Sequence, residues 1–168
     1  EEEGTELLWS YETGSSVVSS AISADGETIA AGSWDKKVYL FDKDSNIPLW
    51  SYETGGFVQW VDISADGEYI VAGSTDNNVY FFGKDSSAPL WSYETGDYIW
   101  GVAISADGTH IAAASYDYNV YFFHRDSSTP VWSYDAGSHV LSVSISADGE
   151  YITAGSWDDK VYLFDKDS

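Results

Sequence analysis

An uninterrupted repeat of 41 residues is the feature that most limits what this chain can fold into. A tryptophan opens each of four copies, and successive tryptophans are 41 residues apart: Trp9, Trp50, Trp91 and Trp132. An Asp-Gly pair returns at the same interval, first at Asp25 and Gly26. A fixed period of about 20–50 residues indicates a repeat architecture, in which each unit buries its apolar faces against its neighbours.

Each copy contains four short segments with β-strand character, which in the first copy span residues 7–12, 17–23, 28–33 and 37–41. The Asp-Gly pair between the second and third segments predicts a tight hairpin. The segment KVYLF at 37–41 is apolar or aromatic on both faces, whereas a two-sheet sandwich or an open meander would leave one face polar. Four strands within about 40–45 residues are typical of one propeller blade. We therefore expect an all-β propeller with four four-stranded blades in the chain.

The stretch ISADGETIAAGSWDKKVYLFD resembles the second half of a WD40 repeat, with Ser33 and Asp35 in the expected turn and Phe41-Asp42 where that family has Trp-Asp. The lead LWSYETG is similar to repeats of PQQ-type and YVTN-type propellers. The Gly-His pair of WD40 repeats is replaced by Thr-Gly or Ala-Gly, so the hydrogen-bonded tetrad that uses this histidine cannot form. The resemblance implies that residues 17–23 are the innermost strand of a blade and that the WSYET strand is outermost.

We expect a single repeat domain over residues 1–168, with repeats at 9–49, 50–90, 91–131 and 132–168. In the order that the resemblance implies, the chain begins with an outermost strand at 7–12 and ends without one. Large side chains near the axis, such as Trp60 and Trp100, favour a ring wider than four blades. We therefore predict a homodimer in which two half-propellers make one eight-bladed ring and each segment 7–12 completes the last blade of the other copy. A fragment of a longer natural propeller and a four-bladed ring closed by one chain are the alternatives.

Charge and composition limit the partners. Twenty-eight acidic residues against seven basic ones give a net charge of −21, which repels phosphate backbones, so we expect no nucleic acid partner. No apolar run approaches the roughly 20 residues that span a bilayer, and no signal-peptide pattern is present, so we expect no membrane partner and assign no compartment. The absence of cysteine excludes disulfides and thiolate metal sites.

Sequence differences between the copies gather at one predicted end of the blades, which we call the top face. The turn ISADG and the start WSY are the same in all four copies. The loop before the inner strand, the start of that strand and the turn between the second and third strands vary and are rich in aromatic residues. We interpret this as a candidate surface for binding a glycan, peptide or protein, the alternative being drift at positions that packing does not constrain. Its residues are Trp34, Phe57, Trp60, Tyr98, Trp100, Tyr116, His139 and Trp157.

No motif predicts catalysis. The serines lack a G-x-S-x-G elbow, glycine loops for phosphates are missing, and Asp42 and Asp44 lack EF-hand spacing. The histidines occupy non-equivalent repeat positions, and we expect them on different blades or faces, where they cannot form a metal cluster: His110, His124 and His139. We predict no catalytic residue, no cofactor and no metal.

These observations favour a non-enzymatic, self-assembling propeller scaffold or binding module. The near-identity of the copies also fits an engineered or recently amplified repeat protein. The alternatives are a natural carbohydrate- or protein-binding propeller fragment and, more distantly, a propeller enzyme.

Overall fold

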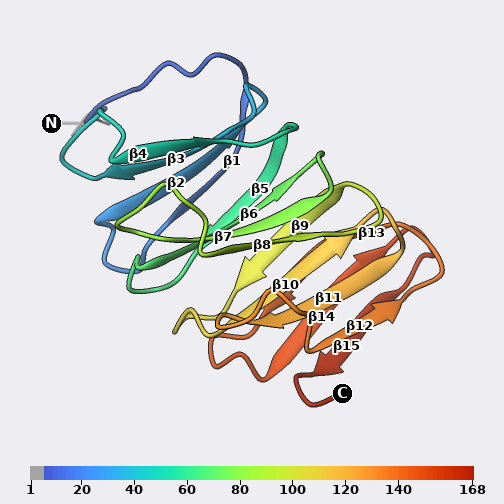
Figure 1. Cartoon of the computed structure of the whole chain (residues 1–168). Coiled ribbons are helices and arrows are strands. Elements are labelled where there is room, and N and C mark those ends of the chain that lie inside the picture. The colour runs from blue at the N-terminus through green and yellow to red at the C-terminus, as the bar shows by residue number, and fades with distance from the viewer. Residues whose placement is uncertain (1–5) are drawn as a thin grey trace, which may run out of the picture.

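The computed structural model describes residues 6–168 and contains four antiparallel sheets that follow one another along the chain (Figure 1). The predicted all-β architecture, with one sheet for each repeat, is confirmed. In the described part of the chain, no helix has the length and hydrophobicity of a membrane span. The strands are β1 (Val17–Ile22), β2 (Thr28–Ser33), β3 (Lys37–Asp42), β4 (Trp50–Glu53), β5 (Val58–Ile63), β6 (Tyr69–Ser74), β7 (Asn78–Gly83), β8 (Trp91–Glu94), β9 (Ile99–Ile104), β10 (His110–Ser115), β11 (Asn119–His124), β12 (Trp132–Asp135), β13 (Val140–Ile145), β14 (Tyr151–Ser156) and β15 (Val161–Asp165).

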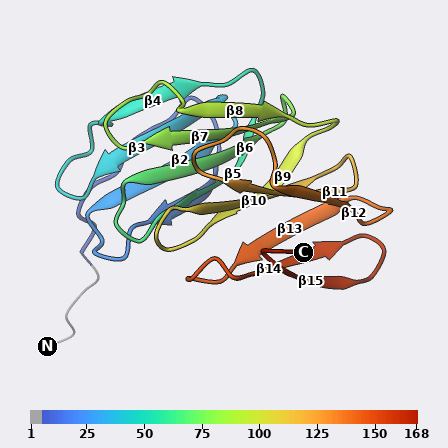
Figure 2. The same cartoon turned by 60° about the horizontal axis from the view of Figure 1, so that its bottom comes forward.

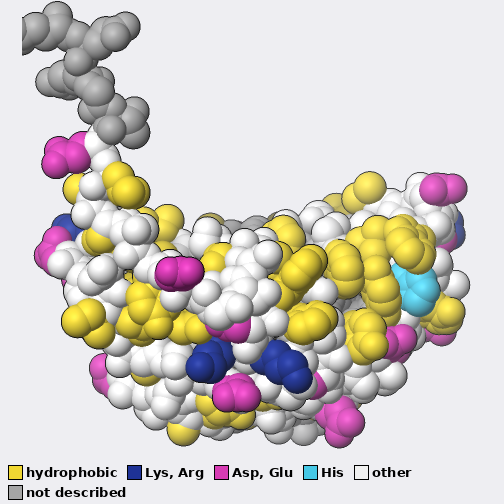
Figure 3. Space-filling view, turned by 90° about the horizontal axis from the view of Figure 1, so that it is seen from above, with side chains coloured by type: hydrophobic (Ala, Val, Ile, Leu, Met, Phe, Trp, Pro, Cys, Tyr) yellow, Lys and Arg dark blue, Asp and Glu magenta, His cyan; other side chains and the backbone are white. Residues whose placement is uncertain are grey.

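The sheets are arranged as successive blades of an arc. The first three have four strands each, paired in sequence order, and the fourth has three. The first strands of neighbouring blades contact one another, β1 with β5, β5 with β9 and β9 with β13. The first and fourth blades lie at opposite ends of the array (Figures 1 and 2), and one side of the molecule is concave (Figure 3).

The segment 7–12, for which a strand is predicted, pairs with no strand within residues 6–168. Its side chains nevertheless lie against the first blade, where the Trp9 and Phe41 rings are 5.3 Å apart. The fourth blade lacks an outer strand in this structure, as the repeat order predicts.

An aspartate organises the turn after the second strand of each blade. Asp35 accepts hydrogen bonds from the Tyr39 hydroxyl (2.6 Å), the Gly14 backbone N–H (2.8 Å) and the Lys37 backbone N–H (3.0 Å). Burial raises the pKa of Asp35, but these hydrogen bonds outweigh burial and hold the pKa below its ordinary value. Lys36 adopts a φ of 72° in this turn. Asp35 lies in the turn where the family resemblance places it, and it accepts backbone hydrogen bonds there.

Each middle blade is covered on both faces. In the third strand of each middle blade, alternate residues point toward the next blade and are buried there. In β7 these residues are Val79 and Phe81, both 0% exposed. Small residues allow the close approach: a Cβ atom added at Gly73 would lie 2.4 Å from Cγ2 of Ile99 in the following blade. A small residue is therefore required in the second strand at this position.

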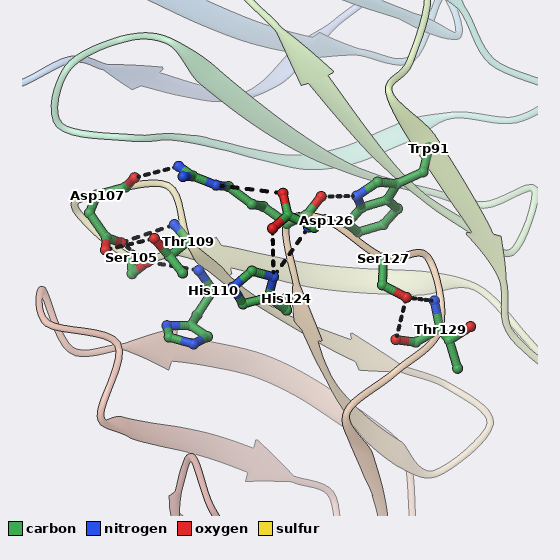
Figure 4. A network of polar contacts seen from close by, with 10 residues as sticks. Trp91, Ser105, Asp107, Thr109, His110, His124, Asp126, Ser127 and Thr129 are labelled. Carbon is green, nitrogen blue, oxygen red and sulfur yellow. Dashed lines mark hydrogen bonds and ion pairs between the residues drawn. The ribbon is translucent and has the colours of Figure 1, made fainter.

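The seam between the third and fourth blades contains a histidine in place of the tyrosine found in two other repeats. His110 stacks on Phe122 with their ring centroids 5.3 Å apart, and its ring meets that of His124 edge-on at 5.7 Å. Figure 4 shows His110 and His124 beside Asp107 and Thr109. The Nδ1 atom of His110 is buried without a hydrogen-bond partner among the described residues, and it fills the space above Gly149. A charged imidazole is therefore poorly accommodated in this seam.

Burial, followed by repulsion from His124, lowers the pKa of His110 below its ordinary value of 6.5. Asp107 and Glu150 attract the charged form and Lys166 repels it, without reversing the shift. Because the folded state favours the neutral ring, this residue supports stability fully above pH of about 6.5. That contribution is lost as the pH falls through 6.5 toward the lower folded-state pKa.

We expect His110→Tyr to remove this loss. The equivalent Tyr69 stacks on Phe81 with their ring centroids 5.5 Å apart, so a tyrosine at position 110 can pack in the same way on Phe122. At fixed protein concentration, urea unfolding at pH 5 and pH 8 should show a smaller difference in unfolding free energy for the variant than for the unsubstituted protein.

The matched control is Tyr69→His, which should introduce a new acid-sensitive component at the seam between the second and third blades. An unchanged pH dependence in His110→Tyr would contradict this account of the seam.

Candidate functional site

Four of the predicted top-face residues lie together with Tyr118 in one group, which we call the aromatic cluster. Its five members are Trp100, Tyr116, Tyr118, His139 and Trp157. Trp100 lies in β9, Tyr116 and Tyr118 in the turn after β10, and His139 and Trp157 directly before β13 and after β14. The rings of Trp100 and Tyr116 stack at 4.9 Å with an interplanar angle of 11°. The cluster therefore spans the third and fourth blades.

His139 lies at the centre of the cluster. Its ring is 4.5 Å from Tyr116, 5.0 Å from Trp157 and 5.0 Å from Tyr118. Its Nδ1 atom is 2.7 Å from the backbone carbonyl oxygen of Tyr116, which orients the imidazole. Sequence reasoning missed Tyr118, although it replaces Lys36, Asn77 and Asp159 of the other copies and this variation was available in the sequence.

A repeated backbone hydrogen bond brings these loops together. In each blade, the turn after the second strand donates an N–H to the loop before the first strand, as from Tyr116 to the Tyr98 carbonyl (2.9 Å) and from Trp157 to the His139 carbonyl (3.0 Å). The same contact joins Trp34 to Ser16 and Thr75 to Phe57. Side chains at these positions are therefore held on one face by the scaffold, whatever their identity.

The other predicted residues lie outside the cluster. Trp34 and Phe57 form a separate pair at 6.0 Å, and the Trp34 indole N–H donates to Oε1 of Gln59 at 3.3 Å. Tyr98 is exposed and makes no ring contact with either group within residues 6–168. Trp60 is half-exposed and lines a hollow beside β9 and β13. The structure thus divides the eight predicted residues into one cluster, one pair and two single rings.

Asp62 lines the same hollow as Trp60. Among β1, β5, β9 and β13, the innermost strands of the four blades, it is the one acidic residue. Its Oδ2 atom accepts the backbone N–H of Ile104 on the next blade at 3.0 Å, and Oδ1 accepts that of Ile63 at 2.9 Å. Burial raises the pKa of Asp62 despite these two hydrogen bonds. This carboxylate joins the inner strands of two blades, a role that its sequence position alone does not indicate.

The cluster offers stacking surfaces with polar edges. Trp157 is 58% exposed and Tyr118 is 44% exposed, so both present ring surface to solvent. Burial, and then the nearby Asp97 carboxylate, raises the pKa of Tyr116, whose hydroxyl stays protonated and able to donate. Aromatic rings of this kind bind apolar or planar ligand faces while their O–H and N–H groups give orientation.

The histidine prediction was wrong in one respect. His110 and His124 are cross-strand partners on β10 and β11 and lie side by side, whereas we expected the histidines on different blades or faces. The register of the β10–β11 hairpin, whose turn is at residues 116–118, opposes them. Residues 6–168 contain no group of three or more histidine, cysteine or acidic side chains arranged to hold a metal ion.

Comparison with known proteins gives a family and a fold. The family described as WD domain, G-beta repeat matches residues 5–42, 46–82, 87–124 and 128–165. No curated protein matches the sequence. The crystal structure of the computationally designed Ika4 protein is similar with a TM-score of 0.84 and 16% sequence identity, covering 96% of this chain and 99% of that chain. At this identity, the likeness to Ika4 concerns the fold alone. Each of the last three family matches spans the outer strand of one blade and the first three strands of the next. The four matches together cover most of the chain and show that it belongs to the WD40 repeat family.

Proposed function

We propose that this chain is a non-enzymatic scaffold that assembles with a second copy of itself into one closed ring of eight blades, twice the four blades of one chain. The observation that carries the proposal is the bare apolar face at each end of the arc. Val161 and Leu163 in β15 are 83% and 70% exposed, whereas their equivalents Val120 and Phe122 are 0% and 1% exposed. The outward face of the last blade has the composition of a buried face.

The first blade has the complementary exposed face. Val17 and Ile22 in β1 are 49% and 61% exposed, whereas the equivalent Val58 and Ile63 are 0% and 8% exposed. At the interior seam between the first and second blades, Val58 and Ile63 pack with Val38 and Leu40, which are the equivalents of Val161 and Leu163. The interior seam therefore supplies a template for packing the last blade of one copy on the first blade of another.

The hydrophobic effect favours this association. Burying a large aliphatic side chain stabilises an interface by about 1.5–3 kcal/mol. A two-fold ring would contain two such seams, each covering at least four exposed aliphatic side chains, which is typical of an obligate interface of about 2,000 Å² or more. Open sheet edges at the same ends add a further drive to associate.

We expect the 168-residue protein to have twice its monomer mass of 18.5 kDa in light scattering at micromolar concentration. Leu163→Glu should weaken the dimer at least about 100-fold, since burying an unpaired carboxylate costs several kcal/mol. Circular dichroism of the variant and a dilution series of the unsubstituted protein separate loss of association from loss of folding.

The control for this substitution is Ile47→Glu, because Ile47 is 73% exposed and its equivalents Ala88 and Thr129 are exposed in the interior repeats. Ile47→Glu should leave the mass unchanged. A monomer mass for the unsubstituted protein, or a Leu163→Glu protein that remains fully dimeric, would overturn the proposal.

The aromatic cluster favours a second candidate function, the binding of carbohydrate at the top face. Sugar rings present C–H faces that stack on tryptophan and tyrosine, and their hydroxyls bind the polar ring edges. The cluster contains exposed ring surface at Trp157 and Tyr118 and no Lys or Arg side chain. This composition fits a neutral glycan better than an anionic ligand.

A glycan array tests this second function. The protein should bind a set of neutral glycans, and Trp157→Ala should reduce that binding at least about tenfold, as for a central aromatic contact. Phe57→Ala, outside the cluster, is the matched control and should bind as the unsubstituted protein does. Absence of binding to the array, or equal binding by Trp157→Ala, would exclude carbohydrate as the ligand of the cluster.

A further inference from the structure

Two of the three histidines of the chain face each other across one hairpin of the third blade. His110 on β10 and His124 on β11 are Cα partners in the antiparallel register. Their ring centroids are 5.7 Å apart at an interplanar angle of 78°. The other blades have no histidine at either position, and their equivalent cross-strand pairs are Thr28 and Asp42, Tyr69 and Gly83, and Tyr151 and Asp165. The histidine pair is therefore particular to the third blade and is not part of the repeated scaffold.

The separation of the two rings suits one shared metal ion. An imidazole nitrogen binds Zn²⁺ at about 2.0–2.1 Å, so two rings that bind the same ion have centroids roughly 5–6 Å apart. The observed 5.7 Å lies in this range. We predicted no metal because we expected the histidines on different blades or faces, and the β10–β11 hairpin places two of them side by side instead.

His110 has a ring nitrogen that the scaffold does not use. Its Nδ1 atom is buried above Gly149 and has no hydrogen-bond partner within residues 6–168. A half-turn of the ring about χ2 would place Cδ2 above Gly149 and release Nδ1, and it would keep the ring plane that stacks on Phe122. Burial also lowers the pKa of His110, which keeps the ring neutral at neutral pH. Neutral imidazole is the form that binds metal ions.

His124 has a carboxylate beside its ring. Its Nδ1 atom lies 3.5 Å from Oδ2 of Asp126 and 3.3 Å from the backbone nitrogen of the same residue (Figure 4). A ring that binds a metal ion through Nε2 carries its proton on Nδ1 and can donate it to this carboxylate. Metal-binding histidines are commonly oriented by a carboxylate in this way. The His124 side chain is 41% exposed, so an ion can reach it from solvent.

The charges around the pair favour a cation. Three carboxylates and two basic side chains lie near the two rings: Asp107, Asp126, Glu150, Arg125 and Lys166. Both basic side chains are ion-paired, Lys166 with Glu150 and Arg125 with Asp126. Three negative charges against two positive ones leave one negative charge here, in a chain whose net charge is −21.

We propose that His110 and His124 bind one divalent transition-metal ion, such as Zn²⁺, Ni²⁺ or Cu²⁺, through one imidazole nitrogen each, with water in the remaining positions. Imidazole suits these ions, whereas Mg²⁺ and Ca²⁺ prefer oxygen ligands. Two protein ligands are fewer than the three or four of a catalytic or structural zinc centre, so the site takes up its ion reversibly from solution. The site lies within one hairpin and does not depend on the proposed ring.

Calorimetric titration of the protein, without an affinity tag, with Ni²⁺ at pH 8 tests the site, since both imidazoles are neutral at that pH. We expect one saturable ion per chain. His110→Tyr and His124→Gly each install the residue of the second blade and should weaken binding at least about tenfold, because loss of even an outer-shell partner weakens metal binding by 10–100-fold. Circular dichroism verifies that each variant is folded.

The matched control is Tyr69→His, which places a single histidine opposite Gly83 at the same position of the second blade. This variant should still bind one ion per chain, and a second ion would overturn the requirement for an opposed pair. Absence of saturable binding, or unchanged binding in either His110→Tyr or His124→Gly, would overturn the site. Displacement of Ni²⁺ by an equal concentration of Mg²⁺ would assign the binding to surface carboxylates and would overturn the site as well.

Discussion

Burial of both faces of each sheet is the constraint on which this structure depends. Phe81 and Phe122 lie on the forward faces of their blades and are completely or almost completely buried, because the next blade covers them. A blade alone has too little core to compensate for the conformational entropy lost on folding, so each unit depends on its neighbours. At the ends of the arc the same faces have no neighbour in this chain. These end faces have the composition of buried faces, since Leu163 and Ile22 are aliphatic although they are exposed.

A fixed set of polar contacts allows the top face to vary without disturbing the blades. Asp35, Asp76 and Asp117 accept the same three kinds of hydrogen bond, and a backbone bond ties each turn to the loop before the first strand. Neither contact depends on the side chains presented to solvent. The scaffold can therefore hold Trp34 against Phe57 at one seam and Tyr116 against His139 at another. This separation of scaffold and surface is how repeat proteins present different side chains on one framework.

The period and the turn residues predict most of the fold from sequence. Asp-Gly pairs mark the hairpins, and the two-faced apolar strand at 37–41 predicts blades rather than a sandwich. The aromatic set is less predictable because sequence position gives the face and not the ring contacts. Trp60 and Tyr98 share the face with Trp100 but are not part of its cluster. The pairing of His110 with His124 depends on hairpin register, and the role of Asp62 depends on the neighbouring blade; both require three-dimensional contacts that periodicity does not supply.

The central claim is that the end faces of one arc are covered by a second copy, and electron microscopy of the 168-residue protein tests it most directly. End-on projection averages should show a closed ring with a central hole and eight radial sectors, twice the four sheets of one chain. The sectors should divide into two equal halves, as expected for a two-fold assembly. A closed ring of four sectors, or an open arc with both end faces in solvent, would contradict the account.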